Sequence, residues 1–498
     1  MWWLIVLLLM CLFLYSRKKL QYFSSRGVQT LPPTPVLGNL VAVTFGGENF
    51  VEAIANGYNA FKDQRYFGLY QYLVPTLIPR DPELIRQIMV RDFQAFSDRG
   101  VHIGADCDPL FGRNLIMLRG SKWRSTRAAL SPAFSAARCR SMAPLMVASS
   151  AGVAEHLRKS VAEPQMMDVN NITTAYVNDV IASCAFGFAV NSLKDPDNCI
   201  FKLGKKAVVQ DTTQVMKFFG YENMKSIMKM LDVKIIKKTY ADQFSQLFKS
   251  ALNARRDNVA EPRPDFIQTL VDAAQDVGTI EFTDDDLVAQ AVLFYVAGYD
   301  TTANLINYFL YEMATHPEVQ EKLLDEIDGL PANDQIEDMY ETVQGLEYLE
   351  MCVSEVLRLW PLVGSADRRS VQNYDFGPTY PGSKHHLVAK AGIHVWLPIY
   401  SIHRDEAYWP EPDRCIPERF AANNKAKIVP YTYLPFGTGP RHCIGSRFAV
   451  LAAKIFLVQF LREFRTRAPR GGRRLCPRAF ILRPKDGFNV VVEPRTVL

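Results

Sequence analysis

One cysteine of the chain lies in a turn that suits a metal ligand. The segment 435–445 reads Pro-Phe-Gly-Thr-Gly-Pro-Arg-His-Cys-Ile-Gly, and a helix is predicted from Ser446 to about Phe464. Glycines and prolines make such a turn rigid, and a thiolate just before a helix is stabilised by the helix N-terminus and by backbone N–H groups. A lone cysteine is more often a small buried hydrophobic residue. Cys443 is therefore a candidate ligand that needs support from other motifs.

A second unusual segment, Ala297-Gly298-Tyr299-Asp300-Thr301-Thr302, lies inside a long apolar stretch. Glycine costs a helix about 1 kcal/mol relative to alanine, and buried polar side chains such as those of Asp300 and Thr301 are costly without partners. Such a departure from packing logic indicates a functional site. The alternative is a helix kink at which hydroxyl groups bond to carbonyl groups four residues earlier.

Two further pairs of residues have helical spacing and are candidates for functional roles. Trp123 and Arg127 are one turn apart, so their side chains share one face of a helix. A surface amphipathic helix is the alternative. Glu355 and Arg358 are three residues apart, a common surface arrangement worth only about 0.2–0.5 kcal/mol. Neither pair indicates a function on its own.

Taken together, these segments resemble the motifs of cytochromes P450. Every named position of the family's haem-binding signature, Phe-x-x-Gly-x-Arg-x-Cys-x-Gly, is matched between Phe436 and Gly445. The resemblance implies that Cys443 binds the iron of haem b. It also implies a set of residues that hold the haem propionates, namely Trp123, Arg127, Arg441 and Arg368. Because Arg369 is adjacent to Arg368, this last assignment is open by one residue.

The remaining motifs take their roles from the same resemblance. Glu355, Arg358 and Arg419 correspond to the family's buried Glu-Arg-Arg network, which locks the segment leading to the haem-binding turn. A half-broken buried network is costly, so these three residues should behave as one unit. Inside the long helix, Asp300 and Thr301 correspond to the residues that relay protons during oxygen activation.

The implied activity is that of a membrane-anchored haem-thiolate monooxygenase, which inserts one oxygen atom of O₂ into a lipophilic molecule while the other leaves as water. The motif sequences are most similar to those of insect xenobiotic- and hormone-oxidising members. Two alternatives stay open: a haem-thiolate isomerase or dehydratase that needs no O₂, and a non-catalytic haem-binding sensor.

The resemblance also implies partners. Electrons from NADPH arrive through NADPH-cytochrome P450 reductase, with cytochrome b5 as a further donor. Lys122, Arg124 and Arg138 lie on or near the helix of Trp123 and are candidates for the basic dock of the reductase. The alternative for this cluster is an ordinary solvated face.

A substrate pocket is expected to be walled by the loop 101–117 and by apolar side chains from distant segments. The predicted pocket residues are Phe294, Ala297, Leu362, Ala366, Phe480 and Ile481. Apolar walls suit a lipophilic ligand. Each of these residues could equally belong to the core.

The sequence pattern of the helices and strands that must position these residues predicts a mainly α fold with minor β. We expect one large helical domain with small β-sheets. Short strands and a helix are expected within 67–88. A capping box formed by Thr283 and Asp286 should start the long helix, which should end near Thr315, before Pro317. A second helix is predicted from about Glu341 to Leu359.

The amino terminus is a candidate transmembrane anchor. Every residue from Met1 to Tyr15 is apolar or aromatic, and Ser16-Arg17-Lys18-Lys19 follow. As a helix this run is about 22 Å long, short of the roughly 30 Å hydrocarbon core of a bilayer. The alternatives are a cleaved signal peptide and a buried core helix. Against cleavage, the charges follow the apolar run and no small-x-small site is present.

This anchor sets the predicted domain organisation. Because positive residues stay on the cytosolic side, an anchor at 1–20 in the endoplasmic reticulum membrane leaves the rest of the chain in the cytosol. A basic and proline-rich linker is expected at 21–40 and the catalytic domain at 41–498.

Composition excludes several other classes of protein. The chain has 498 residues, of which 48% are hydrophobic, enough for a large core. Its 57 basic and 52 acidic residues give a net charge of +5, too small a surplus to indicate nucleic-acid binding. Nine cysteines without CxxC spacing argue against a disulfide scaffold or a zinc ribbon.

Overall fold

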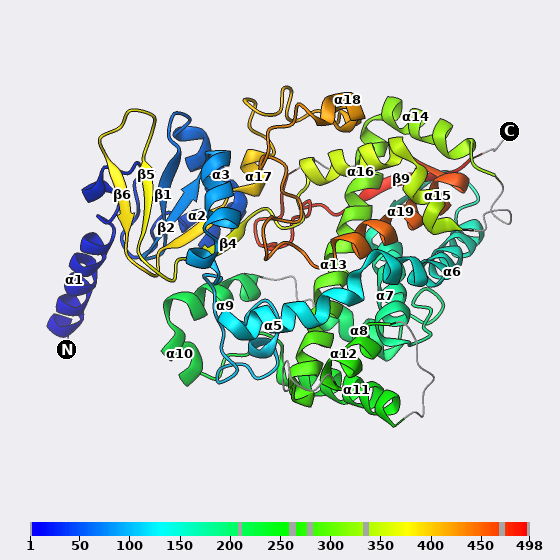
Figure 1. Ribbon diagram of the computed structural model, residues 1–498, viewed down its shortest axis with the longest axis horizontal. Coiled ribbons are helices and arrows are strands. Elements are labelled where there is room, and N and C mark those ends of the chain that lie inside the picture. The colour runs from blue at the N-terminus through cyan, green and yellow to red at the C-terminus, as the bar shows by residue number, and fades with distance from the viewer. Residues whose placement is uncertain are drawn as a thin grey trace.

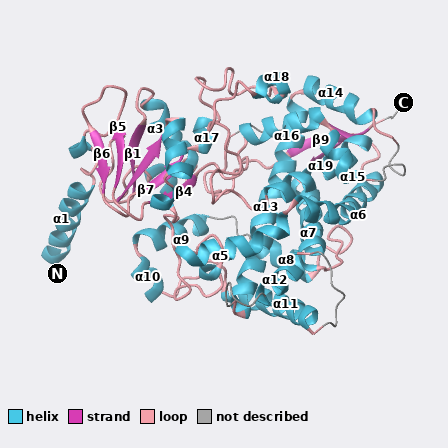
Figure 2. Ribbon diagram, viewed as in Figure 1, coloured by secondary structure: helices cyan, strands magenta, loops and turns pink. Residues whose placement is uncertain are grey.

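A sheet-rich part and a larger helical part, each with its own hydrophobic core, make up the molecule (Figure 1). The computed structural model describes residues 2–207, 212–257, 265–275, 282–331, 338–467 and 474–495. The prediction of a mainly α fold with small sheets is confirmed, since helices dominate and strands gather at two places in the molecule (Figure 2).

Three small sheets contain all the strands of the described residues. A four-stranded sheet has the order β1-β2-β7-β4, in which only the β2–β7 pair is parallel. A three-stranded sheet has the order β3-β9-β8, and β5 pairs with β6. The strands are β1 (Tyr66–Gln71), β2 (Val74–Pro79), β3 (Gln165–Asp168), β4 (Ala366–Arg369), β5 (Tyr374–Pro378), β6 (His386–Ala389), β7 (His394–Leu397), β8 (Phe464–Arg467) and β9 (Asn489–Pro494). With α4, strands β1 and β2 confirm the prediction for 67–88.

The helices form most of the remaining described chain. The first group in chain order is α1 (Trp2–Lys19), α2 (Val41–Thr44), α3 (Phe50–Ala60), α4 (Pro82–Arg86), α5 (Gly120–Leu130), α6 (Ala136–Ser160), α7 (Asn170–Phe186), α8 (Cys199–Ala207), α9 (Thr212–Asn223), α10 (Lys225–Met230), α11 (Lys238–Arg256) and α12 (Phe266–Gln275). The second group is α13 (Asp284–Thr315), α14 (Pro317–Asp328), α15 (Met339–Gly345), α16 (Glu347–Leu359), α17 (Ile399–Ile402), α18 (Ala422–Lys425) and α19 (Ser446–Glu463).

Helix α13 crosses the interior of the helical part, as Figure 1 shows. Its start is the predicted capping box: Asp286 N–H donates to Thr283 Oγ1 and Thr283 N–H donates to Asp286 Oδ2, both at 3.2 Å. The helix ends at Thr315, before Pro317, as predicted. Because it is buried on nearly every side, its few polar residues must find partners or face a cavity.

The segment predicted as one helix from Glu341 to Leu359 is two helices; its predicted end at Leu359 is confirmed, but its continuity is wrong. Helix α15 ends at Gly345, and Leu346 is extended before α16 begins. The physical reason lies in another helix: the Glu326 carboxylate of α14 accepts hydrogen bonds from the N–H groups of Tyr348 (2.8 Å) and Leu349 (2.9 Å). A carboxylate at this place satisfies N–H groups that the first turn of a helix leaves unpaired.

The amino-terminal segment lies beside the four-stranded sheet. Nearly all apolar side chains of α1 are exposed. Its last turn carries Arg17, Lys18 and Lys19. No helix in the described ranges has both the length and the hydropathy required to cross a membrane. The 21–40 segment packs on β1, because Gly68 N–H donates to Gln29 O and Asn39 N–H donates to Tyr70 O.

Candidate active site

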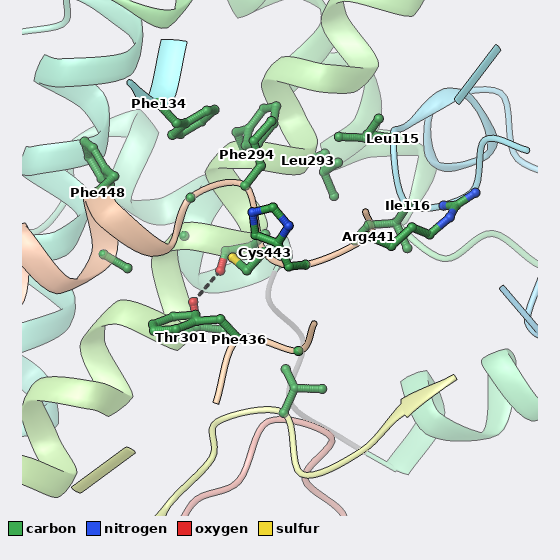
Figure 3. A pocket seen from close by; sticks show the side chains of 18 of the residues that line it. Leu115, Ile116, Phe134, Leu293, Phe294, Thr301, Phe436, Arg441, Cys443 and Phe448 are labelled. Carbon is green, nitrogen blue, oxygen red and sulfur yellow. Dashed lines mark hydrogen bonds between the residues drawn. The ribbon is translucent and has the colours of Figure 1, made fainter. Parts of the chain in front are cut away.

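A cavity of about 330 Å³ lies beside the middle of α13. Its walls come from many distant segments, among them the loop 101–117, α5, α7, α12, α13, the stretch around β4, and the turn that precedes α19. Figure 3 shows Cys443 and Arg441 of this turn facing the same space as Thr301, Leu293 and Phe294 of α13. The structure therefore brings together residues that are more than 300 positions apart in the sequence.

The turn that carries Cys443 is held in shape by glycines. Gly437 and Gly439 adopt the left-handed conformation, with φ near +70°. A Cβ atom at Gly439 would overlap the carbonyl oxygen of Met89, so only glycine fits there. The Cys443 N–H donates to Phe436 O at 2.9 Å, which closes the turn and directs the thiol into the cavity.

Cys443 is exposed to the cavity, whose walls are largely apolar and carry cations. Desolvation by the surrounding protein raises the pKa of its thiol, while the backbone N–H of Gly445 and the guanidinium groups of Arg127 and Arg99 oppose that rise. An apolar site with nearby cations is suited to a thiolate that is also bonded to a metal.

Four arginines line the cavity from different segments: Arg99, Arg127, Arg368 and Arg441. Arg368 is fully buried and its Nε has no hydrogen-bond partner in the part of the chain that the structure describes. Burial and neighbouring cations lower the pKa of Arg368 to about 9, and the same causes lower the pKa of Arg441 to about 9. Burial also lowers the pKa of Arg127. The Asp367 carboxylate, whose charge acts on both Arg368 and Arg441, is already bonded to Arg99 at 2.8 Å. Such a cluster calls for an anionic ligand.

The aromatic ring of Trp123 completes this cationic wall. The Arg441 guanidinium lies over the Trp123 ring, 4.2 Å from its centre. Arg441 is fixed by donating to Ser97 O (2.7 Å) and Leu118 O (2.9 Å). Trp123 and Arg127 both line the cavity from α5, so the shared face predicted for them points inward. Arg369, on the opposite face of β4, is exposed.

The α13 side of the cavity carries the predicted polar segment. Thr301 lines the cavity, and its hydroxyl donates to Ala297 O at 2.6 Å, as the dashed line in Figure 3 shows. Thr302, Ala297 and Gly298 also line it. Asp300 is buried and is not among the lining residues; it lies near Tyr299, where its charge adds to the burial that raises the Tyr299 pKa.

The predicted network of Glu355, Arg358 and Arg419 is assembled away from the cavity. Arg358 donates to both carboxylate oxygens of Glu355, from Nε at 2.7 Å and from Nη2 at 2.8 Å. Arg419, in the 3₁₀ helix Pro417–Phe420 (η7), donates to Glu355 Oε1 at 3.3 Å. Both Glu355 and Arg358 are fully buried. The network thus joins α16 to the segment that leads to the Cys443 turn.

Comparison with known proteins identifies the family. A family model described as Cytochrome P450 matches residues 28–492. The chain belongs to the cytochrome P450 family. It is 35% identical over 503 residues to Cytochrome P450 9e2 of Blattella germanica, covering 95% of this chain and 92% of the relative. It is 33% identical over 496 residues to Probable cytochrome P450 9f2 of Drosophila melanogaster, covering 95% of each chain.

As a cytochrome P450, the protein is a monooxygenase that carries haem with cysteine-ligated iron. The residues of the cavity fit this group: the buried cations of Arg368 and Arg441 and the half-buried cation of Arg127 match the propionate carboxylates, and Cys443 offers a thiolate across the cavity from Thr301. The family also implies a redox partner and lipophilic substrates.

Other predicted residues of this P450 are distributed as follows. Phe436 and Gly445 line the cavity, and so do Phe294, Leu362 and Ala366. Phe480 and Ile481 are not among the lining residues: Phe480 is 47% exposed, and its ring stacks on that of Phe218 at 6.1 Å.

Several cavity residues have no signal in the sequence. Phe134 and Phe266 pack against Phe294, with ring centres 5.0 and 4.4 Å away. Arg99 lines the cavity while bonded to Asp367. No motif or spacing marks them, because they come from separate elements that only the fold brings together.

Two of the nine cysteines line the cavity, Cys184 and Cys443. Cys184 lies on α7, where burial raises its pKa. Cys415 lies elsewhere, within 4.8 Å of ligand atoms of Glu312 and His316. In this cluster Glu312 accepts a hydrogen bond from Trp360 Nε1 at 2.8 Å.

Proposed function

We propose that this P450 oxidises lipophilic small molecules with O₂ and with electrons that NADPH supplies through NADPH-cytochrome P450 reductase. The observation that carries the proposal is the convergence of the Cys443 thiol, the buried Arg368 and Arg441 and the half-buried Arg127 on a cavity with largely apolar walls. No Asp or Glu is among the described residues that line the cavity, so the site offers no carboxylate to a cationic substrate. This composition favours neutral apolar molecules.

We assign the residues to roles as follows. Haem bound here supplies the electron-rich iron that activates O₂. Cys443 provides the thiolate ligand, and Arg368, Arg441, Arg127 and Trp123 hold the propionates. Leu115, Ile116 and Leu293 belong to the wall that binds and orients the substrate and excludes water.

Thr301 and Asp300 are proposed to move protons. The Thr301 hydroxyl lies on the cavity wall, where its bond to Ala297 O holds it in one orientation. Asp300 lies behind it on the same helix and is buried, so it can act on the cavity only through Thr301 or through water. General-acid assistance of this kind typically contributes 10²–10⁴-fold to a rate.

The ligand assignment is tested by the absorption spectrum of the reduced protein with carbon monoxide. Wild-type protein should show the red-shifted band of thiolate-ligated haem. Cys443→Ala should lose this band, whereas Cys415→Ala, Cys352→Ala and Cys184→Ala should keep it. Retention of the band in Cys443→Ala refutes the assignment, and its loss in Cys415→Ala alone would transfer the role to that residue.

The reductase assignment is tested by turnover. NADPH consumption that depends on added reductase, O₂ and a lipophilic compound supports a monooxygenase; product formation without NADPH supports an isomerase or dehydratase.

We propose that Lys122, Arg124 and Arg138 form the basic surface on which the reductase docks. The Lys122 side chain is half-exposed, and its Nζ lies 3.4 Å from Asp286 Oδ1. Arg124 Nη2 donates a hydrogen bond to Gln94 Oε1 at 3.1 Å. Arg124→Glu should weaken reductase binding at low salt and change it little at high salt.

We further propose that the protein attaches to the endoplasmic reticulum membrane through α1. The exposed apolar side chains of this helix and the three cations of its last turn suit insertion with the charges at the lipid headgroups. A chain lacking residues 2–19 should not sediment with phospholipid vesicles, whereas the full chain should. Equal sedimentation of the two proteins would refute this role.

A further inference from the structure

His403 is a fully buried histidine that the proposed reaction does not use. It follows α17 and has no exposed surface. The Leu434 N–H donates to its Nε2 at 2.7 Å, and its Nδ1 lies 3.0 Å from Arg358 O. Since a backbone N–H can only donate, Nε2 must be the unprotonated nitrogen, and Nδ1 carries the hydrogen that bonds to Arg358 O. Burial lowers the pKa of His403 to about 3, consistent with this neutral tautomer.

On one side, the ring is tied to α16. Arg358 O lies at the end of this helix, where carbonyl groups lack partners within the helix. The bond is reciprocated, because Arg358 Nη1 donates to the carbonyl oxygen of His403 itself at 2.8 Å. His403 is thereby locked to the same arginine that bonds to Glu355.

On the other side, the ring is tied to the segment that enters the Cys443 turn. Leu434 O accepts a hydrogen bond from Gly437 N at 3.0 Å, and Phe436 O accepts one from Cys443 N at 2.9 Å. A short series of backbone bonds therefore connects Leu434 to Cys443. The preceding residue, Tyr433, stacks on the His403 ring at 5.6 Å and donates to Ser354 O of α16 at 3.0 Å.

We propose that His403 is a positioning residue for the thiolate ligand: its imidazole accepts the Leu434 N–H and thereby holds the entrance of the Cys443 turn at a fixed place against α16. The inference rests on the proposed role of Cys443. It differs from a simple packing role, because packing requires the ring and its volume, whereas positioning requires a hydrogen-bond acceptor at Nε2.

Three substitutions separate the two roles. His403→Phe keeps a flat ring that can stack on Tyr433 but removes both hydrogen bonds. His403→Gln can place an acceptor where Nε2 lies, and His403→Asn can place one only near Nδ1. Tyr433→Phe is the matched control, because it removes the bond to Ser354 and leaves the His403 bonds in place.

The experiment uses the haem-loaded proteins in the reduced state with carbon monoxide. The measured quantity is the rate at which the red-shifted thiolate band converts to the band of the protonated thiol in mild urea. His403→Phe and His403→Asn should convert about 10-fold faster than wild type, the size expected when one buried N–H loses its acceptor. His403→Gln and Tyr433→Phe should stay within about 2-fold of wild type. The haem reduction potential should shift in the first two variants and return in His403→Gln.

The outcomes separate the proposed function from the role of His403. Absence of the red-shifted band in wild-type protein would overturn the proposed function. A normal band in wild type together with an unchanged rate in His403→Phe, or equal rates in His403→Gln and His403→Asn, would overturn the role of His403 alone. Failure of all three variants to hold haem would also overturn it, because it would assign His403 to the folding of the whole core.

Discussion

Replacing Glu355 by glutamine should destabilise the protein far more than the same change in an equally spaced surface pair. Glu355 accepts four hydrogen bonds, from Arg358 Nε and Nη2, Ile416 N and Arg419 Nε, at 2.7–3.3 Å. The side chains of Glu355 and Arg358 have no exposed surface. Glu355→Gln therefore leaves a buried guanidinium without its counter-charge, which costs about 3–5 kcal/mol.

The structure offers a matched control in the pair of Glu83 and Arg86. This pair has the same i,i+3 spacing and also forms two bonds, at 2.7 and 2.6 Å, but it lies on the surface. Because solvent screens exposed pairs, Glu83→Gln should leave stability almost unchanged. Arg419→Met should be intermediate, about 1 kcal/mol, since its bond is longer and its side chain is 12% exposed.

The assay is urea unfolding of the haem-loaded protein, followed by tryptophan fluorescence and by the haem band. A total free energy of unfolding of about 5–15 kcal/mol is typical. Glu355→Gln should therefore lower the urea concentration at the unfolding midpoint by a large fraction of its wild-type value, and it should reduce haem retention. Equal midpoints for Glu355→Gln and Glu83→Gln would refute the reasoning, because the two pairs share their spacing and their two Arg–Glu bonds but differ in burial and in the further bonds that Glu355 accepts from Ile416 and Arg419.

Three further predictions follow from the cavity and its support. Thr301→Val keeps the shape of the side chain but not its hydroxyl, so it should lower product formed per NADPH by as much as about 10²-fold and raise hydrogen peroxide release; unchanged coupling, or the same loss in Thr302→Val, contradicts the relay. Phe294→Ala should lower stability by about 3 kcal/mol and change which compounds shift the haem spectrum, whereas Phe480→Ala, at a 47% exposed ring, should leave the melting temperature nearly unchanged. The pKa of His403 is about 3 in the folded protein against an ordinary 6.5, so the unfolded chain binds an extra proton between these values. Stability should fall by about 1.4 kcal/mol per unit as pH drops below 6.5, and less steeply in His403→Gln; parallel pH profiles in urea unfolding would contradict this.

Local patterns predicted those parts of the structure that local interactions determine. The capping box located the first turn of α13, because both of its hydrogen bonds are made within four residues. The glycine-rich turn before α19 was likewise predicted, since its backbone shape depends on its own glycines. The Glu355–Arg358 pair is a different case: its spacing is equally common on surfaces, and only the family resemblance indicated that it is buried.

What the sequence could not predict depends on contacts between distant segments. The break before α16 arises from Glu326 of another helix. The choice between Arg368 and Arg369 depends on the register of β4 against β7, which decides the side of the sheet each residue faces. The aromatic contacts of Phe294 come from α12 and from the turn after α5. The placement of Phe480 away from the cavity wall is equally a property of the assembled fold.

The position of β9 has a consequence for how the chain is made. This strand lies between β3 and β8, and just before it Phe488 N–H donates to Asp168 Oδ1 across 320 residues. A ribosome adds about 5–20 residues per second, so β3 waits on the order of tens of seconds for its partner. During that time its edge is unpaired and open to other strands. A premature stop codon shortly before Asn489 would remove the central strand of this sheet, so we expect such a shortened product to be recognised by chaperones and degraded even though every residue of the haem-binding turn has already been translated.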